Sequence, residues 1–223
     1  MLPPILKSMD LNEQKNKILE AGLKDVPFDG WSLSTFECAA EKMGEDPQIV
    51  PALFPRGEHD LMDYFGEWTD DKMLGALSSI HADDLKVRAR IRMAVEKRIE
   101  ILTPYKEAVN ICFKKLILPQ NARLGTKITW RTADKIWDWA GDTSTDYNHY
   151  TKRGLLSGVI ATTMTYWLQR DNDGDNQATY EFLNKRIENV LFIGQNTTKV
   201  IKPIEGFIKN IIIPNIKSRT GKI

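Results

Sequence analysis

The sequence has 223 residues, of which 42% are hydrophobic and 27% are charged, and its formal net charge is +1. This composition is typical of a soluble globular protein that can bury a real core, and it excludes a disordered chain. The near-zero net charge by itself predicts affinity neither for nucleic acid nor for membranes.

Almost every segment keeps a 3.6-residue apolar period, and none alternates over the length of a strand, which predicts an all-α fold. A first helix is predicted from Leu11 to Leu23. A second begins at a capping box, Ser34–Glu37, and ends at Gly44. The third, Asp46–Leu53, has proline in its first turn. A longer helix follows and continues through Trp68.

Three short helices and a longer one are the layout of a helix-turn-helix module, which resembles the N-terminal part of the tetracycline-repressor (TetR) family. This interpretation would place Asp46–Leu53 in the major groove of DNA. A DNA-binding surface must neutralise several phosphates, whereas residues 45–53, EDPQIVPAL, hold two acids and no base. We therefore predict a degenerate module that keeps the packing and does not bind nucleic acid.

The main part of the chain predicts further helices. Asp83–Leu102 carries a basic strip with interleaved acids, which indicates a solvated face. Tyr105–Leu118 and Ala122–Ala140 follow, and Gly141 fits a left-handed helix cap. The helix from Tyr147 to Leu168 is apolar over much of its circumference, so it is either central to the core or lines a cavity.

The segment Asp142-Thr143-Ser144-Thr145-Asp146 separates two of these helices. A helix cap uses one or two such groups. Five in succession exceed that need, and polar, aromatic and basic side chains follow closely. We therefore predict that this stretch forms a recognition surface for a partner.

No pattern predicts catalysis, a cofactor or a metal site. The connector Asp171–Asp175 resembles a calcium loop, but the twelfth position counted from Gln169 is Tyr180 rather than a bidentate glutamate. The three histidines, His59, His81 and His149, lack the pair spacing of a metal site, and phosphate-loop and nucleophile motifs are absent. A last helix of the main part is predicted from Thr179 to Ile193.

The tail, residues 200–216, predicts a short amphipathic helix between two prolines. About 11 residues, or ~16 Å, are too few to span a bilayer but suit its interface. The alternative, in which this helix docks on the body of the protein or on a second subunit, is equally open. The residues assigned to membrane contact are Ile204, Phe207, Ile208, Lys209, Ile211 and Ile212.

The charge divides the chain into three predicted parts. Residues 1–66 hold 6 Lys/Arg and 12 Asp/Glu, residues 67–194 hold 19 and 17, and residues 195–223 hold 6 and 1. The net charges are therefore −6, +2 and +5. We interpret these parts as the degenerate module, the main helical domain and an amphipathic C-terminal helix and tail.

The cysteines and the start of the chain favour a reducing, cytoplasmic location. Cys38 and Cys112 each lie in a helical apolar pattern, which favours buried free thiols over a disulfide. The start, MLPPILKSMD, has neither the apolar core of a secretory signal nor the Arg-rich character of an organelle presequence.

The sequence resembles the coenzyme Q biosynthesis protein nine family, whose members are TetR-like lipid-binding proteins that assist ubiquinone synthesis. The resemblance covers most of the chain. It is carried chiefly by Trp137–Asp142, Ser144–Asn148 and Tyr150–Arg153, and more loosely by Thr179–Ile187, Ile101–Pro119, Ile18–Ala21 and Gly30–Trp31.

The resemblance implies an all-helical, TetR-like fold, often dimeric, with an apolar cavity for an isoprenoid lipid or quinone precursor. It also implies a terminal helix at the membrane surface and a partner, the membrane-bound di-iron quinone hydroxylase. The cavity residues expected from helix faces and resemblance are Trp139, Leu156, Ile160, Met164 and Trp167. The partner-binding residues expected are Asp142, Asp146, Asn148, His149, Tyr150 and Arg153.

Two departures from the family pattern affect these expectations. The family usually has tryptophan at the position of His149, so the contact here is smaller or matched to a changed partner. The tail is also short, which argues against strong membrane attachment. The plain N-terminus favours a bacterial protein over a mitochondrial import, and we expect it to be peripheral on the inner face of the cytoplasmic membrane. The alternative function is a TetR-like transcriptional regulator with a ligand cavity.

Overall fold

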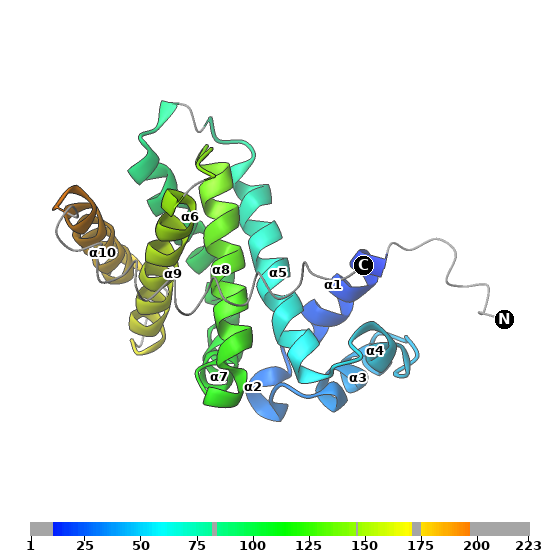
Figure 1. Cartoon of the computed structure of the whole chain (residues 1–223). Helices are drawn as coiled ribbons and strands as arrows, with labels where there is room; N and C mark the ends of the chain where they lie inside the picture. The colour runs from blue at the N-terminus through cyan, green and yellow to red at the C-terminus, as the bar shows by residue number, and fades with distance from the viewer. Residues whose placement is uncertain (1–10, 82–83, 146, 171–174, 197–223) are drawn as a thin grey trace, which may run out of the picture.

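The computed structural model describes residues 11–81, 84–145, 147–170 and 175–196, and within these ranges all regular structure is helical. The predicted all-α fold is therefore confirmed (Figure 1). The elements are α1 (Leu11–Gly22), α2 (Val26–Asp29), α3 (Leu33–Lys42), α4 (Ile49–Leu53), α5 (Glu58–Leu77), α6 (Val87–Leu102), η3 (Thr103–Tyr105), α7 (Lys106–Leu116), η4 (Pro119–Asn121), α8 (Ala122–Trp139), α9 (Tyr147–Leu168) and α10 (Gln177–Asn196).

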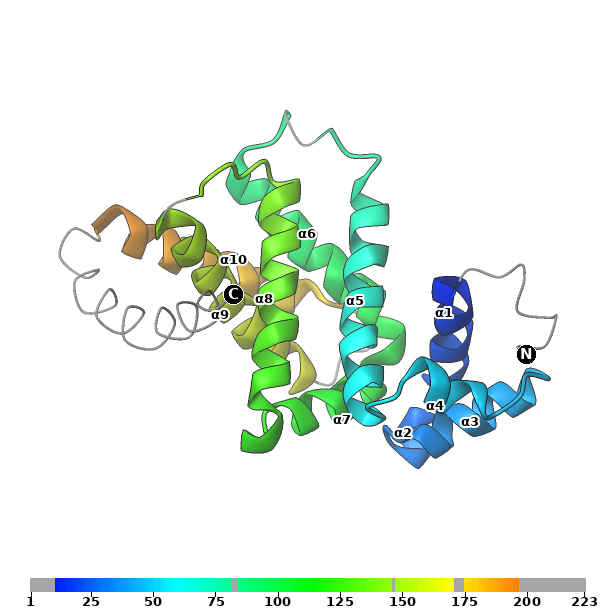
Figure 2. The same cartoon turned by 45° about the vertical axis from the view of Figure 1, so that its right-hand side comes forward.

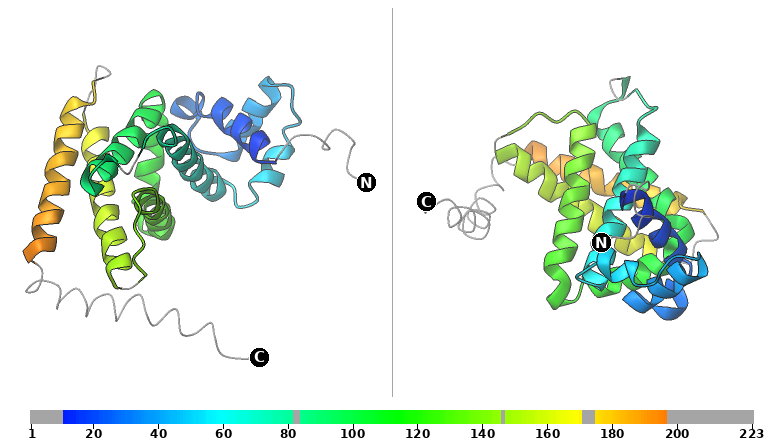
Figure 3. Two further views of the ribbon diagram at one scale, coloured as in Figure 1. Left: turned by 90° about the horizontal axis from the view of Figure 1, so that it is seen from above. Right: turned by 90° about the vertical axis from the view of Figure 1, so that its right-hand side faces the viewer.

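The four short N-terminal helices gather at one end of the molecule, and α5 runs from them into the main bundle (Figure 2). The predicted boundary at residue 66 falls inside α5, which continues unbroken across it. Seen from above, α9 and α10 lie side by side at the far end from the short helices (Figure 3). This α9–α10 layer borders the candidate site.

Several predicted helix starts are corrected by the structure. Ser32, not Ser34, caps α3, because Ser32 has an extended backbone and its Oγ accepts a hydrogen bond from the Thr35 amide at 3.2 Å. Pro27 lies within an extra helical turn, α2, where only a link was expected. Helix α6 begins at Val87 rather than Asp83.

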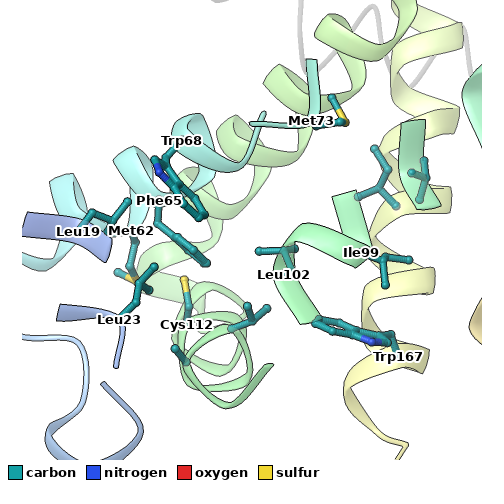
Figure 4. Packing of buried hydrophobic residues seen from close by; sticks show 14 of the residues in the cluster. Leu19, Leu23, Met62, Phe65, Trp68, Met73, Ile99, Leu102, Cys112 and Trp167 are labelled. Carbon is teal, nitrogen blue, oxygen red and sulfur yellow. The ribbon is translucent and has the colours of Figure 1, made fainter. Parts of the chain in front are cut away.

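A single hydrophobic core extends from α1 to α10. Figure 4 shows Leu23, Met62, Phe65 and Cys112 packed together between α1, α5 and α7, with Trp167 of α9 further along the same core. The N-terminal part of the chain shares this core. Trp31, which lies between α2 and α3, packs its indole against the Phe65 ring of α5, with the ring centroids 5.2 Å apart.

The two cysteines differ in their surroundings. Cys112 is buried, and this burial raises the pKa of its thiol to about 12. Cys38 is exposed, so its predicted burial is wrong. Helix α3 turns Phe36, Ala39 and Ala40 inward instead, which leaves Cys38 on the solvent side.

A buried charge cluster joins α5 to α6 and α8. The side chain of Asp70 on α5 is fully buried and forms an ion pair with Arg98, which is also buried. The hydroxyl of Thr132 donates to Asp70 at 2.9 Å, and Arg131 approaches the same carboxylate at 3.5 Å. The pairing compensates the desolvation of these charges.

Gly22 allows α1 to approach α3 closely, and we expect Gly22→Ala to destabilise the fold. A Cβ atom at Gly22 would lie 2.3 Å from the buried Phe36 ring. Overpacking of this kind lowers the free energy of unfolding by about 1–3 kcal/mol. Gly75→Ala on α5 is the control, because a Cβ there meets nothing within 4 Å. Gly75→Ala should leave the free energy of unfolding, measured by urea denaturation, unchanged or slightly higher. Equal effects of the two substitutions would contradict the prediction.

Within the described residues, no helix combines the length and apolar character that crossing a bilayer requires.

Candidate functional site

The predicted recognition surface begins where α8 ends. Gly141 has a φ of 85°, which confirms the predicted left-handed cap. The amide of Asp142 donates to the carbonyl oxygen of Trp137 at 3.0 Å, so the chain reverses tightly after α8. We call residues 141–145 the polar turn. Asp146 lies outside the described residues.

Arg153 is a buried anchor beneath the polar turn. Its side chain is 2% exposed and is paired with carboxylates of Asp134, Asp138 and Asp142. Asp134, Asp138 and Asp142 follow one another at intervals of four residues, which places them along one side of α8 and its cap. This spacing was the sequence signal that could have revealed the anchor. Arg153 therefore fixes the turn instead of offering a free guanidinium to a partner.

The carboxylate of Asp142 is the second buried group of the turn, at 4% exposure. It accepts from Lys152 Nζ at 2.6 Å, from Arg153 at 3.0 Å and from the Ser144 hydroxyl at 2.8 Å. Burial alone would raise the pKa of Asp142, but these hydrogen bonds and charges hold that pKa well below its usual range.

The lowered pKa of Asp142 predicts a loss of stability in acid. A carboxyl whose pKa is lower in the folded state stabilises the fold above its unfolded pKa of about 3.9, and this contribution falls as pH drops below that value. We expect Asp142→Asn to be less stable than the wild type at pH 7, with a difference that shrinks below about pH 4. Urea denaturation across this range measures it, and a difference independent of pH would contradict the assignment.

The exposed residues of the predicted partner surface lie at the start of α9. Asn148 and Tyr150 are exposed, and His149 is half-buried. The Nδ1 atom of His149 lies 3.1 Å from the carbonyl oxygen of Ser144, which can only accept, so Nδ1 donates. The Tyr150 ring meets the His149 ring edge-on at 5.2 Å. These three side chains present the accessible chemistry of the surface.

An apolar pocket of about 320 Å³ lies next to the polar turn, between α6, α8, α9 and α10. Its volume is at the lower end of the range of about 300–1,000 Å³ for small-molecule sites. Hydrocarbon side chains dominate its wall, and its two cations, Arg88 and Lys152, are paired with Glu188 and Asp142. The lining residues are Val87, Arg88, Ile91, Trp137, Lys152, Leu155, Leu156, Val159, Ile187 and Val190.

The predicted cavity residues are divided among different places. Leu156 lines the apolar pocket, whereas Ile160 and Met164 border a separate cavity of about 100 Å³ between α5 and α9. Trp167 is fully buried and donates to Asn176 at 3.0 Å, and Trp139 packs against the core. Neither indole lines these two cavities.

Two larger hollows, of about 500 and 470 Å³, lie beside α5 and are lined by many polar groups. Asn12, Asn16, Glu67, Asp71 and Lys72 line the first. Such walls disfavour an apolar chain, since the buried polar groups would lose their hydration. Of these three hollows, the apolar pocket therefore has the wall best suited to an apolar ligand.

The predicted membrane residues, from Ile204 to Ile212, lie in the tail outside the described residues. Among the residues that the structure describes, no group of three His, Cys, Asp or Glu side chains is placed to hold a metal ion.

Comparison with known proteins supports the resemblance. The COQ9 family model matches residues 122–194. The chain is 28% identical to the mitochondrial ubiquinone biosynthesis protein COQ9 of Rattus norvegicus over 216 residues, covering 93% of this chain and 69% of that protein. It is 26% identical to the protein of the same name from Homo sapiens, covering 93% and 67%. The predicted resemblance to the coenzyme Q biosynthesis protein nine family is confirmed.

A solved structure supports the fold assignment. The TetR transcriptional regulator from Nitrosomonas europaea superposes with a TM-score of 0.63 at 15% identity, covering 80% of this chain and 98% of that one. At this identity the likeness shows the TetR-like fold alone. The fold prediction is confirmed.

The predicted location is wrong. The plain N-terminus predicts a bacterial protein, peripheral on the inner face of the cytoplasmic membrane. The relatives from Rattus norvegicus, Homo sapiens and Drosophila melanogaster are all named as mitochondrial proteins, which contradicts that placement.

Proposed function

Because this chain is a relative of the COQ9 proteins, we propose that it acts in ubiquinone biosynthesis as a non-catalytic, lipid-binding accessory protein. It binds a polyprenyl quinone precursor and presents it to a membrane-bound di-iron hydroxylase. The names of the relatives support the role in ubiquinone biosynthesis. The apolar pocket beside the polar turn is the observation that supports lipid binding and presentation.

The energetics favour an uncharged chain in this pocket. A polyprenyl chain is nearly insoluble in water, and each CH₂ group withdrawn from water gains about 0.8 kcal/mol. The pocket offers mainly hydrocarbon, and its two cations already have carboxylate partners. At about 320 Å³ it encloses one part of a long chain and leaves the remainder outside.

The polar turn supplies the proposed docking surface for the hydroxylase. Asn148, His149 and Tyr150 are the exposed or half-buried groups that would meet it. Arg153 and Asp142 would act from beneath, by holding the turn in shape. We further propose that the basic tail, residues 195–223, brings the pocket to an anionic bilayer surface.

The test is extraction of bound lipid from protein purified under native conditions. We expect an isoprenoid lipid from the wild type. Leu155→Trp fills the pocket and should lower the recovered lipid at least tenfold, since excluding a few CH₂ groups exceeds the 1.4 kcal/mol that corresponds to tenfold. Thr162→Trp, on an exposed part of the same helix and outside the apolar pocket, is the control and should retain the lipid.

Recovery of no lipid from the wild type, together with no binding to anionic liposomes, would overturn the proposal.

A TetR-like regulator remains the alternative, but no feature of the described residues favours it. Helix α4 stands where a recognition helix would lie and has five residues, IVPAL, without a base. Arg56, which follows it, forms an ion pair with Asp60 at 2.6 Å. DNA binding would need several free cations here.

A further inference from the structure

We propose that contact at the polar turn changes how tightly the apolar pocket holds its lipid, through a relay of hydrogen bonds from His149 to Lys152. The inference rests on the proposed function, because it takes the pocket as the lipid site and the turn as the docking surface. It assigns Lys152 as a positioning residue at the pocket rim.

The relay begins at the surface and ends in the pocket wall. The ring of His149 donates to the carbonyl oxygen of Ser144 at 3.1 Å, and the Ser144 hydroxyl donates to the Asp142 carboxylate at 2.8 Å. The same carboxylate accepts from Lys152 Nζ at 2.6 Å. Lys152 lines the apolar pocket. Each step is a direct contact.

A second connection joins the same turn residue to the same wall. The amide of Asp142 donates to the Trp137 carbonyl oxygen at 3.0 Å, and the Trp137 indole donates to the Lys152 carbonyl oxygen at 3.1 Å. The Lys152 ammonium also lies 5.4 Å from the centre of the Trp137 ring. Since Trp137 lines the pocket too, a shift of Asp142 moves two wall residues at once.

Of the two cations that share Asp142, Lys152 has fewer carboxylate partners. Arg153 is 2% exposed and is also held by Asp134 and Asp138. Lys152 is 39% exposed, and among the described residues its ion pair is with Asp142 alone. Lysine is a flexible point charge, whereas the arginine fork is fixed by its geometry. If the Asp142 carboxylate moves away from these cations, Lys152 therefore loses its ion pair at the pocket wall, whereas Asp134 and Asp138 still hold Arg153 in place.

Coupling between two sites is reciprocal, so a lipid in the pocket must also change the turn. This allows the relay to be tested without the partner. The probe is farnesol, an uncharged isoprenoid alcohol, added to the chain of 223 residues. Hydrogen–deuterium exchange of a peptide covering residues 141–149 reports the turn, and stopped-flow transfer of farnesol to phosphatidylcholine vesicles reports the pocket.

In the wild type we expect farnesol to change exchange in the turn peptide. In Lys152→Met, which keeps the aliphatic stem, farnesol should still bind, its release should be at least about fivefold faster, and the response of the turn peptide should fall to the part that Trp137 transmits through its backbone contact with Asp142. Lys152→Arg keeps a cation within reach of Asp142 and should restore the response. Thr162→Trp should behave as the wild type does.

The outcomes separate the relay from the function on which it rests. Farnesol binding by the wild type without any change in the turn peptide overturns the relay and leaves lipid binding intact. Failure of the wild type to bind farnesol overturns both. If Lys152→Met does not fold, Ser144→Ala replaces it, since it removes the hydroxyl contact between Ser144 and Asp142, leaves the longer amide contact of 3.5 Å, and keeps the ion pair. In that variant Asp142 keeps its contacts with Lys152 and Trp137, so exchange is followed in a peptide confined to residues 145–149. An undiminished response of that peptide overturns the relay.

Discussion

Replacing Asp70 by alanine is expected to lower the free energy of unfolding by about 3–5 kcal/mol. Asp70 is fully buried, and its carboxylate compensates the charge of Arg98, whose side chain is 9% exposed. Without Asp70, the Arg98 guanidinium stays buried without its ion-pair partner and the Thr132 hydroxyl loses an acceptor. Asp70→Asn should be similarly unstable, which would show that charge and not size is responsible.

The neighbouring residue provides a matched control for this prediction. The side chain of Asp71 is 64% exposed and pairs with Lys135 on the surface. Exposed pairs contribute about 0–1 kcal/mol, so Asp71→Ala should change the free energy of unfolding by less than about 1 kcal/mol. Urea denaturation of both variants at pH 7 measures the difference. A loss below about 1 kcal/mol for Asp70→Ala would show that the cluster does not hold α5 to α6 and α8.

Arg153→Met is expected to lower the free energy of unfolding by about 2–3 kcal/mol. Methionine retains most of the buried length of the side chain but leaves the Asp142 carboxylate with Lys152 as its remaining cation. The expected loss is smaller than at Asp70. The side chains of Asp134 and Asp138 are 43% and 63% exposed, so water can hydrate their carboxylates when the guanidinium is absent. Arg153→Lys should recover only part of it, since three different guanidinium nitrogens contact the three carboxylates and lysine has a single nitrogen in their place.

Arg170→Met is the control for Arg153→Met, because Arg170 lies just after the end of the same helix, α9. Arg170 is exposed, and its guanidinium donates to the Tyr166 hydroxyl at 2.7 Å. Its loss should change the free energy of unfolding by about 0.5 kcal/mol or less. Hydrogen exchange of residues 141–149 adds a local measurement: Arg153→Met should deprotect this segment and Arg170→Met should not. Equal protection in both variants would contradict the anchoring role.

Local sequence patterns were sufficient for the fold but ambiguous for several boundaries. The 3.6-residue period predicted α1, α5, α8 and α9, and the glycine after α8 predicted its cap. The capping pattern predicted Ser34 as the cap of α3, but Ser32 caps this helix because Ser32 has the extended backbone. The prediction for Cys38 was wrong because Phe36, Ala39 and Ala40 form the face of α3 that is buried, and Cys38 lies outside that face.

The candidate site was predictable in part. The excess of polar groups after Gly141 indicated the turn, and the apolar circumference of α9 indicated a cavity or a core. A helix that is apolar on most sides gives no periodic signal for which side faces a pocket. Ile160, Met164 and Trp167 were therefore grouped with Leu156, although Leu156 alone of the five predicted residues lines the apolar pocket.

The sequence by itself determined the helical fold, the net negative charge of the first module and the position of the polar turn, because these depend on neighbours in the chain. Only the tertiary structure decided that Arg153 is an anchor, that Lys152 and Trp137 belong to a pocket wall, and that Val87 and Ile91 face them. Burial and pairing across helices depend on which faces meet, and that is set by the packing of α6, α8, α9 and α10 together.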